Sequence, residues 1–216
     1  DLAYNNGGYE ATLTFRAWDR RSGYAGQTNA DSSIATGGGS AFSLDTDAAI
    51  CPVDDVNDAP VLAVEARLAF DPIEGDDLDP AGQSAAAMLA SDPAFTDPVS
   101  DPDVGHQGGL ALIGFSGADR GAWQVRISGD LTWTPLPTDL SDAAALLLPP
   151  EVQVRFVPSA AAAASFTAGL DFRAWDRTTG SIGYRTDVSV NGGTTSFSAG
   201  TQVAALEVHA ANAAPP

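Results

Sequence analysis

The chain contains no lysine, one cysteine and two histidines, and each shortage excludes a class of protein. Ten arginines stand against 28 acidic residues, which gives a formal net charge of −18 at pH 7. A charge of this sign disfavours binding to nucleic acid or to anionic membranes. A single cysteine cannot close an intrachain disulfide, and two isolated histidines do not provide the spacing of a zinc site. Cys51 lies in the apolar alternation AAICPV, so we expect it to be a small buried hydrophobic residue.

Long hydrophobic runs are also absent. The most apolar stretches, residues 143–150 and 159–166, are shorter than the roughly 18–20 residues that span a bilayer, so we expect no membrane insertion. Hydrophobic residues nevertheless make up 44% of the chain, which is enough for the core of a globular protein.

The acidic residues are concentrated in one part of the chain. Fifteen of the 28 lie between Leu44 and Asp103, where Arg67 is the only basic residue. So many carboxylates in a folded stretch repel one another unless a cation neutralises them. The pattern favours a divalent cation as a ligand, and the alternative explanation is simple solubility.

One segment, FRAWDR, occurs at residues 15–20 and again at residues 172–177. The two copies are 157 residues apart. After a gap of two residues the match resumes, with GGGSAFS (37–43) facing GGTTSFS (192–198). A self-match of this length indicates a repeat architecture.

The repeat covers roughly residues 11–60 and 168–215, whereas residues 61–167 occur only once. The simplest interpretation is a tandem array that the chain enters in mid-repeat. We therefore expect two domains: residues 1–58 form the C-terminal part of one repeat, and residues 59–216 form a complete repeat. A half-domain of about 60 residues leaves open strand edges, so we expect another copy or a further segment to complete it.

Alternating apolar and polar residues predict β-strands. In ATLTFRAW, Leu13, Phe15 and Ala17 lie on one face of an extended chain, and the same alternation recurs in GAWQVRIS, VQVRFVP and ALEVHA. Gly, Pro, Asp, Asn and Ser separate these segments, as turns require. The Ala-rich residues 84–91 form either one turn of helix or a strand. Several short strands with polar turns predict an all-β fold of the β-sandwich type.

Three short acidic motifs fall at the ends of these strands. They are DDVNDAP (54–60), DPDVG (101–105) and AWD (174–176), the last with a copy at residues 17–19. Ca²⁺ binds roughly six to eight oxygen atoms, and no loop of the chain has the spacing of an EF-hand. Carboxylates that converge from separate strand ends would provide such ligands. The alternative is that these Asp residues only form turns.

Together these motifs resemble the Ca²⁺-binding motifs of cadherin-like repeats. DDVNDAP resembles the linker between two such repeats, DPDVG the acidic motif near the start of the following domain, and AWD a motif at the end of a later strand. The longer run from WQVRISGDLTWTPL to NAAP resembles the cadherin-like repeats of giant acidic adhesins that bacteria secrete. The resemblance implies a Greek-key, Ig-like β-sandwich in an extracellular tandem array, with Ca²⁺ at the joints between repeats.

The resemblance also implies a set of calcium ligands at the joint between the two domains. These are Asp55, Asn57 (mainly through its backbone carbonyl), Asp58, Asp101, Asp103 and Asp176. Asp19 would serve the previous joint, and Glu74 the joint at the far end of its own domain. At that far joint Ala210 and Ala213 replace two linker Asp residues, so we expect no complete calcium cluster there.

These expectations describe a non-catalytic extracellular module, a spacer or adhesion repeat that Ca²⁺ makes rigid, in a long bacterial surface adhesin or fibre. Its partners would be neighbouring repeats or other copies of the same protein. An enzyme is disfavoured, because the chain has neither a nucleophile elbow nor an H-E-x-x-H motif.

Two alternatives remain open. The chain is a filament subunit if another copy completes residues 1–58 by domain swapping or strand complementation. It is a module that binds a glycan, a protein or another cell-surface ligand if its tryptophans are exposed on one sheet face. We expect Trp18 and Trp175 to be packing residues, and Trp123 and Trp133 to lie in the core or in a hairpin.

Overall fold

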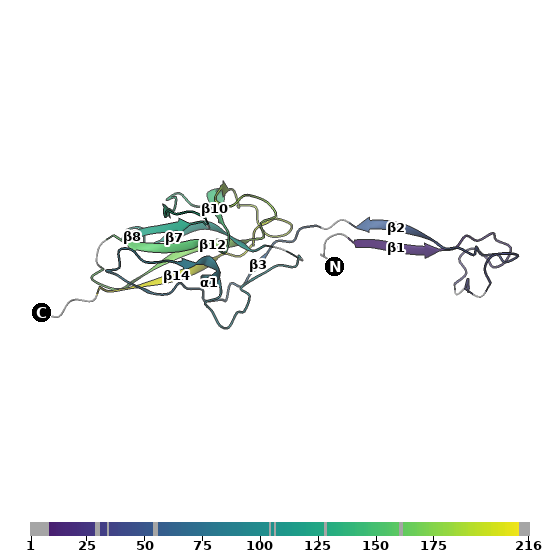
Figure 1. Ribbon diagram of the computed structural model, residues 1–216, viewed down its shortest axis with the longest axis horizontal. Helices are drawn as coiled ribbons and strands as arrows, with labels where there is room; N and C mark the ends of the chain where they lie inside the picture. The colour runs from purple at the N-terminus through teal and green to yellow at the C-terminus, as the bar shows by residue number, and fades with distance from the viewer. Residues whose placement is uncertain are drawn as a thin grey trace. The chain divides into compact units, whose positions relative to one another are not determined.

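The computed structural model describes residues 9–28, 31–33, 35–53, 56–103, 105, 107–127, 129–159 and 162–211. The chain divides into two compact units, Asp1–Asp55 and Val56–Pro216. Strands in several sheets form nearly all the regular structure (Figure 1), which confirms the expected all-β fold of the β-sandwich type. The two described helices have five and three residues, so no helix in the described part could cross a membrane.

The first unit contains a two-stranded antiparallel sheet, β1 (Tyr9–Phe15) and β2 (Asp47–Val53). The register places Leu13 opposite Ala49. Residues directly opposite one another share a face of the sheet, so Leu13, Phe15 and Cys51 lie on one face, whereas Ile50 lies on the other. The face of Leu13 is exposed, because 68% of the surface of Leu13 and 46% of that of Phe15 is accessible to solvent.

The larger sheet of the second unit has six strands. In spatial order they are β13 (Arg185–Thr186), β10 (Ala145–Leu148), β7 (Gly109–Ser116), β12 (Phe166–Trp175), β14 (Gln202–His209) and β4 (Ile73–Glu74). The pair β14 and β4 is parallel, and the other pairs described in this sheet are antiparallel. The long strands β7, β12 and β14 lie side by side (Figure 1).

The smaller elements complete the second unit. A four-stranded sheet has the order β5 (Gln83–Ser84), β11 (Gln153–Pro158), β8 (Gly121–Arg126) and β9 (Thr134–Pro135). Strands β3 (Val61–Leu62) and β6 (Val99–Ser100) form a separate antiparallel pair. Residues Asp142–Ala144 form a 3-10 helix, η1. The Ala-rich segment left open as helix or strand is helix α1 (Ala85–Leu89), which Ser84 caps by accepting a hydrogen bond from the Ala87 N–H at 3.1 Å.

Side chains from the six-stranded and the four-stranded sheet meet in one apolar core. Trp123 and Phe156 of the four-stranded sheet, and Leu170 and Phe172 of the six-stranded sheet, are at most 2% exposed. The ring centroids of Trp123 and Phe156 are 5.3 Å apart in an edge-to-face arrangement. Since burial of apolar surface contributes about 25 cal/mol per Å², this core is the main source of the unit's stability.

A smaller apolar cluster lies on the other face of the six-stranded sheet. It consists of Ala111, Ala145, Leu147, Trp175, Val188 and Phe197. Strand β10 is therefore buried on both faces, with Leu146 and Leu148 in the main core and Leu147 in the smaller cluster. This double burial explains why β10 is a continuous apolar run in the sequence and does not alternate.

The described part of the first unit has the same local structure as the second half of the second unit. Trp18 Nε1 donates to the carbonyl of Ser22 at 2.7 Å, and Trp175 Nε1 donates to the carbonyl of Thr179 at 2.7 Å. The register between β1 and β2 is the register between β12 and β14, once the offset between the copies is applied. The sequence repeat is thus a structural repeat.

The turn that follows each of these tryptophans is also the same. Arg20 and Arg177 have φ angles of 67° and 68°, and they are the non-glycine residues with positive φ in the described part of the chain. A left-handed backbone costs a residue with a Cβ roughly 1–2 kcal/mol, so it needs support from its surroundings. Because the same turn forms twice, the local sequence is sufficient to support it.

The expectation that Cys51 is buried is wrong. The cysteine lies in the middle of β2 and is exposed. Its counterpart in the second unit, Leu206, is 3% exposed because the four-stranded sheet covers that face. In the described part of the first unit β1 and β2 form a sheet of only two strands, so the apolar alternation has no second layer to pack against.

Candidate metal centre

Two short strands bring the first two acidic motifs together. Asn57 and Asp58 lie just before β3, and Asp101 lies just after β6. Strands β3 and β6 are antiparallel, with Val61 opposite Ser100, so the start of β3 lies beside the end of β6. The linker and the second acidic motif are therefore neighbours in space.

Strand β12 brings the third motif to the same place. Asp176 directly follows β12 and is 3% exposed. Asn57 Nδ2 donates to Asp176 Oδ2 at 2.9 Å and to the carbonyl of Thr195 at 3.2 Å. The N–H of Ala59 donates to the carbonyl of Gly193 at 2.8 Å, which attaches the linker to the loop that follows β13.

Hydrogen bonds join the remaining residues into one group. The Asp58 N–H donates to Asp103 Oδ2 at 2.8 Å, and the Asp103 N–H donates to Asp101 Oδ1 at 2.8 Å. All three residues are partly buried. We call Asn57, Asp58, Asp101, Asp103 and Asp176 the acid cluster. Five of the six residues expected at the first joint thus lie together within the second unit.

Neighbouring hydroxyl groups hold Asp176, and the sequence interpretation did not include them. Asp176 Oδ1 accepts hydrogen bonds from the Thr178 N–H at 2.8 Å and from Thr178 Oγ1 at 2.6 Å. Thr178 Oγ1 in turn lies 2.6 Å from Ser196 Oγ. The D-x-T spacing is the available sequence signal, since Asp commonly accepts from the backbone two residues on.

The acid cluster has the donor atoms of a Ca²⁺ site but lacks its geometry among the described residues. Asp101 Oδ2 and Asp103 Oδ1 are buried from solvent, and burial of a carboxylate oxygen is costly unless charge compensates it. Such oxygens are the ligands that Ca²⁺ prefers. The described His, Cys, Asp and Glu side chains include no group of three or more arranged to hold a metal ion. Asp55, the sixth expected ligand, lies outside the described residues.

The two other expected ligands do not belong to the acid cluster. Asp19 belongs to the first unit, where its Oδ1 accepts from the Arg21 N–H at 2.8 Å, in the turn that corresponds to that of Asp176. Glu74 pairs with His209 across the β4–β14 edge, and its Oε1 lies 3.3 Å from His209 Nδ1. The register of β12 and β14 places His209 at the opposite end of the sheet from Asp176.

The tryptophans give little support to a glycan-binding face. Trp123 and Trp175 are 2% and 1% exposed, which confirms them as packing residues. Trp133 is partly buried beneath two guanidinium groups, with the Cζ atoms of Arg126 and Arg155 at 4.6 and 4.4 Å from its ring centroid.

No family model, curated protein or solved structure matches the chain.

Proposed function

We propose that the protein is a non-catalytic extracellular module in which Ca²⁺, bound by the acid cluster together with Asp55, makes a tandem array of repeats rigid. The observation that carries the proposal is that the three acidic segments converge. Three segments far apart in the sequence, around residues 57–58, 101–103 and 176, meet at one end of the second unit. Each contributes oxygen-bearing side chains, and two of the carboxylate oxygens are buried.

The residues of the acid cluster have distinct roles in this proposal. Asp58, Asp101 and Asp103 would supply carboxylate oxygens, Asp176 a buried carboxylate, and Asn57 its backbone carbonyl. Bound Ca²⁺ supplies the positive charge that offsets the mutual repulsion of these groups. The hydrogen bonds from Asn57 and Asp58 to the other two motifs already hold the segments near one another, which lowers the ordering cost of binding.

The rest of the chain is compatible with such a module. The sequence resembles cadherin-like repeats of secreted bacterial adhesins, which are Greek-key β-sandwiches, and the net charge of −18 suits a protein that takes up divalent cations. Extracellular modules of this class bind Ca²⁺ with dissociation constants of about 10⁻⁴–10⁻³ M, which corresponds to extracellular calcium levels. A spacer or adhesion repeat of a surface adhesin or fibre, joined to neighbouring repeats, is therefore the proposed role.

Thermal unfolding with Ca²⁺ or with EDTA tests the proposal. At a calcium concentration ten times the dissociation constant, the free energy of unfolding should rise by about 1.4 kcal/mol, because the ion binds only the folded state. Mg²⁺ should have a smaller effect, since it keeps its water ligands. Solution scattering should give a longer particle with Ca²⁺ than with EDTA.

A pair of variants distinguishes the acid cluster from general acidity. The double variant Asp101→Asn, Asp103→Asn should lose the calcium response, whereas Asp119→Asn, Asp130→Asn removes two exposed carboxylates outside the cluster and should keep it. An equal calcium response in the two double variants, or no response in the unaltered chain, would refute the proposed site.

A further inference from the structure

The two copies of the repeat have the same local structure but a different environment. Leu13 and Phe15 of β1 are 68% and 46% exposed, whereas their counterparts Leu170 and Phe172 of β12 are 2% and 0% exposed. One face of the β1–β2 sheet, which we call the acceptor face, carries the apolar residues Ala11, Leu13, Phe15, Ala49, Cys51 and Val53, with Asp47 at its edge opposite Phe15. The repeated strand sequence thus lies in a core in the second unit and is exposed in the first unit.

The second unit contains the elements that bury the equivalent face. Strand β7 pairs with the outer edge of β12, with Leu112 opposite Phe172 and Gly109 opposite Trp175. The four-stranded sheet then covers the face with Trp123 and Phe156. All of these elements come from residues 61–165, within the part of the repeat that occurs once in the chain.

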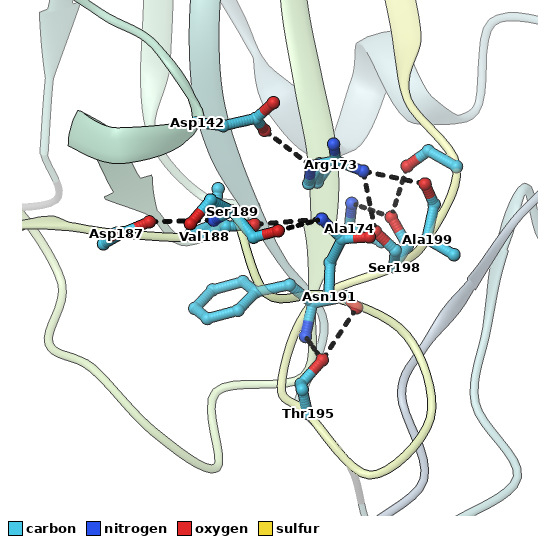
Figure 2. Close-up of polar contacts among 12 residues, drawn as sticks. Asp142, Arg173, Ala174, Asp187, Val188, Ser189, Asn191, Thr195, Ser198 and Ala199 are labelled. Carbon is cyan, nitrogen blue, oxygen red and sulfur yellow. Dashed lines mark hydrogen bonds and ion pairs between the residues drawn. The ribbon is translucent and has the colours of Figure 1, made fainter.

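A polar contact joins the same two halves of the second unit. Figure 2 shows Arg173 between Asp142 and the carbonyls of Ser198 and Ala199. Its Nε donates to Asp142 Oδ1 at 2.8 Å, and its Nη1 donates to the two carbonyls at 3.1 and 2.8 Å. Asp142 lies in η1, which belongs to the half that occurs once.

Arg16 has half of this arrangement. Its Nη1 donates to the carbonyl of Ser43 at 3.0 Å and to that of Leu44, the counterparts of the two carbonyls that Arg173 binds. The described residues of the first unit provide no counterpart of Asp142 for its Nε. Arg16 is therefore already held in the orientation that would receive a carboxylate.

We propose that the acceptor face and the outer edge of β1 bind the first half of another repeat of the same type, located outside these 216 residues. The register follows from the second unit. A strand like β7 pairs antiparallel with β1, with an apolar residue in the place of Leu112 opposite Phe15 and a glycine in the place of Gly109 opposite Trp18.

Two positions of the donor are defined chemically. Glycine is required opposite Trp18, because a Cβ at Gly109 would lie 2.7 Å from Trp175 Cε3. A carboxylate in the place of Asp142 completes the contacts of Arg16. The donor is thus recognisable by a strand like β7 that alternates small and large apolar residues, and by an acidic residue just before the strand that corresponds to β10.

A second copy of the chain is not the donor, for a stoichiometric reason. These 216 residues contain two second halves, residues 11–60 and 168–215, but a single first half. Exchange of first halves between copies therefore leaves one acceptor face uncovered per chain, whatever the number of copies. The half inside the second unit is also linked to β12 by a short connection, so its effective concentration favours its own partner.

The thiol of Cys51 provides the test, because it is the only thiol and lies on the acceptor face. Tyr9 and Phe166 occupy equivalent positions, opposite Val53 and Val208. A longer chain with a second copy of residues 59–165 joined to Tyr9 therefore supplies the donor with the natural connection. The rate of Cys51 modification by Ellman's reagent should fall at least about a hundredfold relative to the 216-residue chain.

A variant of the longer chain provides the control. Leu112→Asp in the added copy places a charge against Phe15 and should restore fast modification of Cys51. The proposal is wrong if the longer chain reacts as fast as the 216-residue chain. It is also wrong if the 216-residue chain becomes protected as its concentration rises, since a second copy would then cover the face. Neither outcome depends on Ca²⁺, so all measurements are made in EDTA.

Discussion

Arg173 and Asp142 form an ion pair, with Nε and Oδ1 2.8 Å apart, across 31 residues of sequence. The Arg173 side chain is only 10% exposed, and its Nη1 also donates to two backbone carbonyls. One guanidinium group therefore joins β12, η1 and the loop before β14. Hydrogen bonds to charged groups are worth more than neutral ones, and a guanidinium can make several of them in fixed directions.

Replacement of Arg173 by Lys should lower the free energy of unfolding of the second unit by about 1.5–3 kcal/mol, because the ammonium group cannot make all of these bonds. Urea denaturation followed by tryptophan fluorescence gives the value. Arg16→Lys is the matched control, and it should change the same transition by less than about 0.5 kcal/mol. Equal effects of the two substitutions would contradict the structural role of the Asp142 contact.

The buried copy of the repeated leucine should matter far more than the exposed one. Leu170→Ala removes a side chain that is 2% exposed and should destabilise the second unit by about 2–5 kcal/mol. Leu13→Ala changes a side chain that is 68% exposed and should cost less than about 0.5 kcal/mol. Thermal unfolding of both variants checks the difference. In the longer chain, where the acceptor face is covered, Leu13→Ala should become as costly as Leu170→Ala.

Gly180, in the turn that follows Trp175, is required for two reasons. Gly180 has φ of +84°, and a Cβ there would clash with Leu147 Cδ1 in the smaller apolar cluster. Gly180→Ala should therefore cost the backbone penalty of roughly 1–2 kcal/mol and a further 1–3 kcal/mol for overpacking. Its counterpart Gly23 has φ of +78°, but the nearest atom to a Cβ there is the flexible Gln27 Oε1 at 2.9 Å. Calorimetry should give a smaller loss for Gly23→Ala, and the reverse order would refute this packing argument.

Acid should remove one surface contribution to stability. The hydrogen bond from Arg185 to Asp139, 2.6 Å long, lowers the pKa of the Asp139 carboxyl below its ordinary value of 3.8. A pKa that is lower in the folded state stabilises the fold above the unfolded value, and this contribution disappears as the pH falls below 3.8. The effect is small and sensitive to salt, since the Asp139 side chain is 75% exposed.

The variant Asp139→Asn lacks this contribution at every pH. Its melting temperature should lie below that of the unaltered chain at about pH 6, and the two should coincide by about pH 2. High salt at about pH 6 should narrow the difference. If the difference in melting temperature stays constant between about pH 6 and about pH 2, the substitution acts through packing and the charge of Asp139 has no part in it.

Much of the fold follows from local patterns in the sequence. Alternation located the strands around Leu13 and Phe156, and the FRAWDR repeat identified two segments that do share one conformation. These features depend on residues close together in the chain, which is why pattern and structure agree. The helix at residues 85–89 stayed ambiguous, because a short Ala-rich run suits both states and the cap from Ser84 decides it.

The sequence could not show whether a second sheet covers the apolar face of β1 and β2. Alternation around Cys51 indicates which face of β2 is apolar, but burial depends on what lies over that face. For the acid cluster, the resemblance to cadherin-like repeats predicted one site with Asp58, Asp103 and Asp176. The β3–β6 pairing explains why Asp58 and Asp103 are neighbours, and the end of β12 adds Asp176. The hydroxyl groups of Thr178 and Ser196 were missed because their role depends on a contact between two loops.

The left-handed turn at Arg20 and Arg177 has a kinetic consequence. The turn forms with and without a covering sheet, so the arch between β12 and β14 needs only contacts within its own stretch of chain, such as Ala174 with Ser198, 24 residues away. Pairing of β7 with β12 closes a longer loop and loses more entropy. The arch should therefore form early in refolding, while the β7 edge docks last and limits the rate. Substitution of Thr178 should then change the folding barrier nearly as much as it changes the stability, which is a kinetic φ-value near 1.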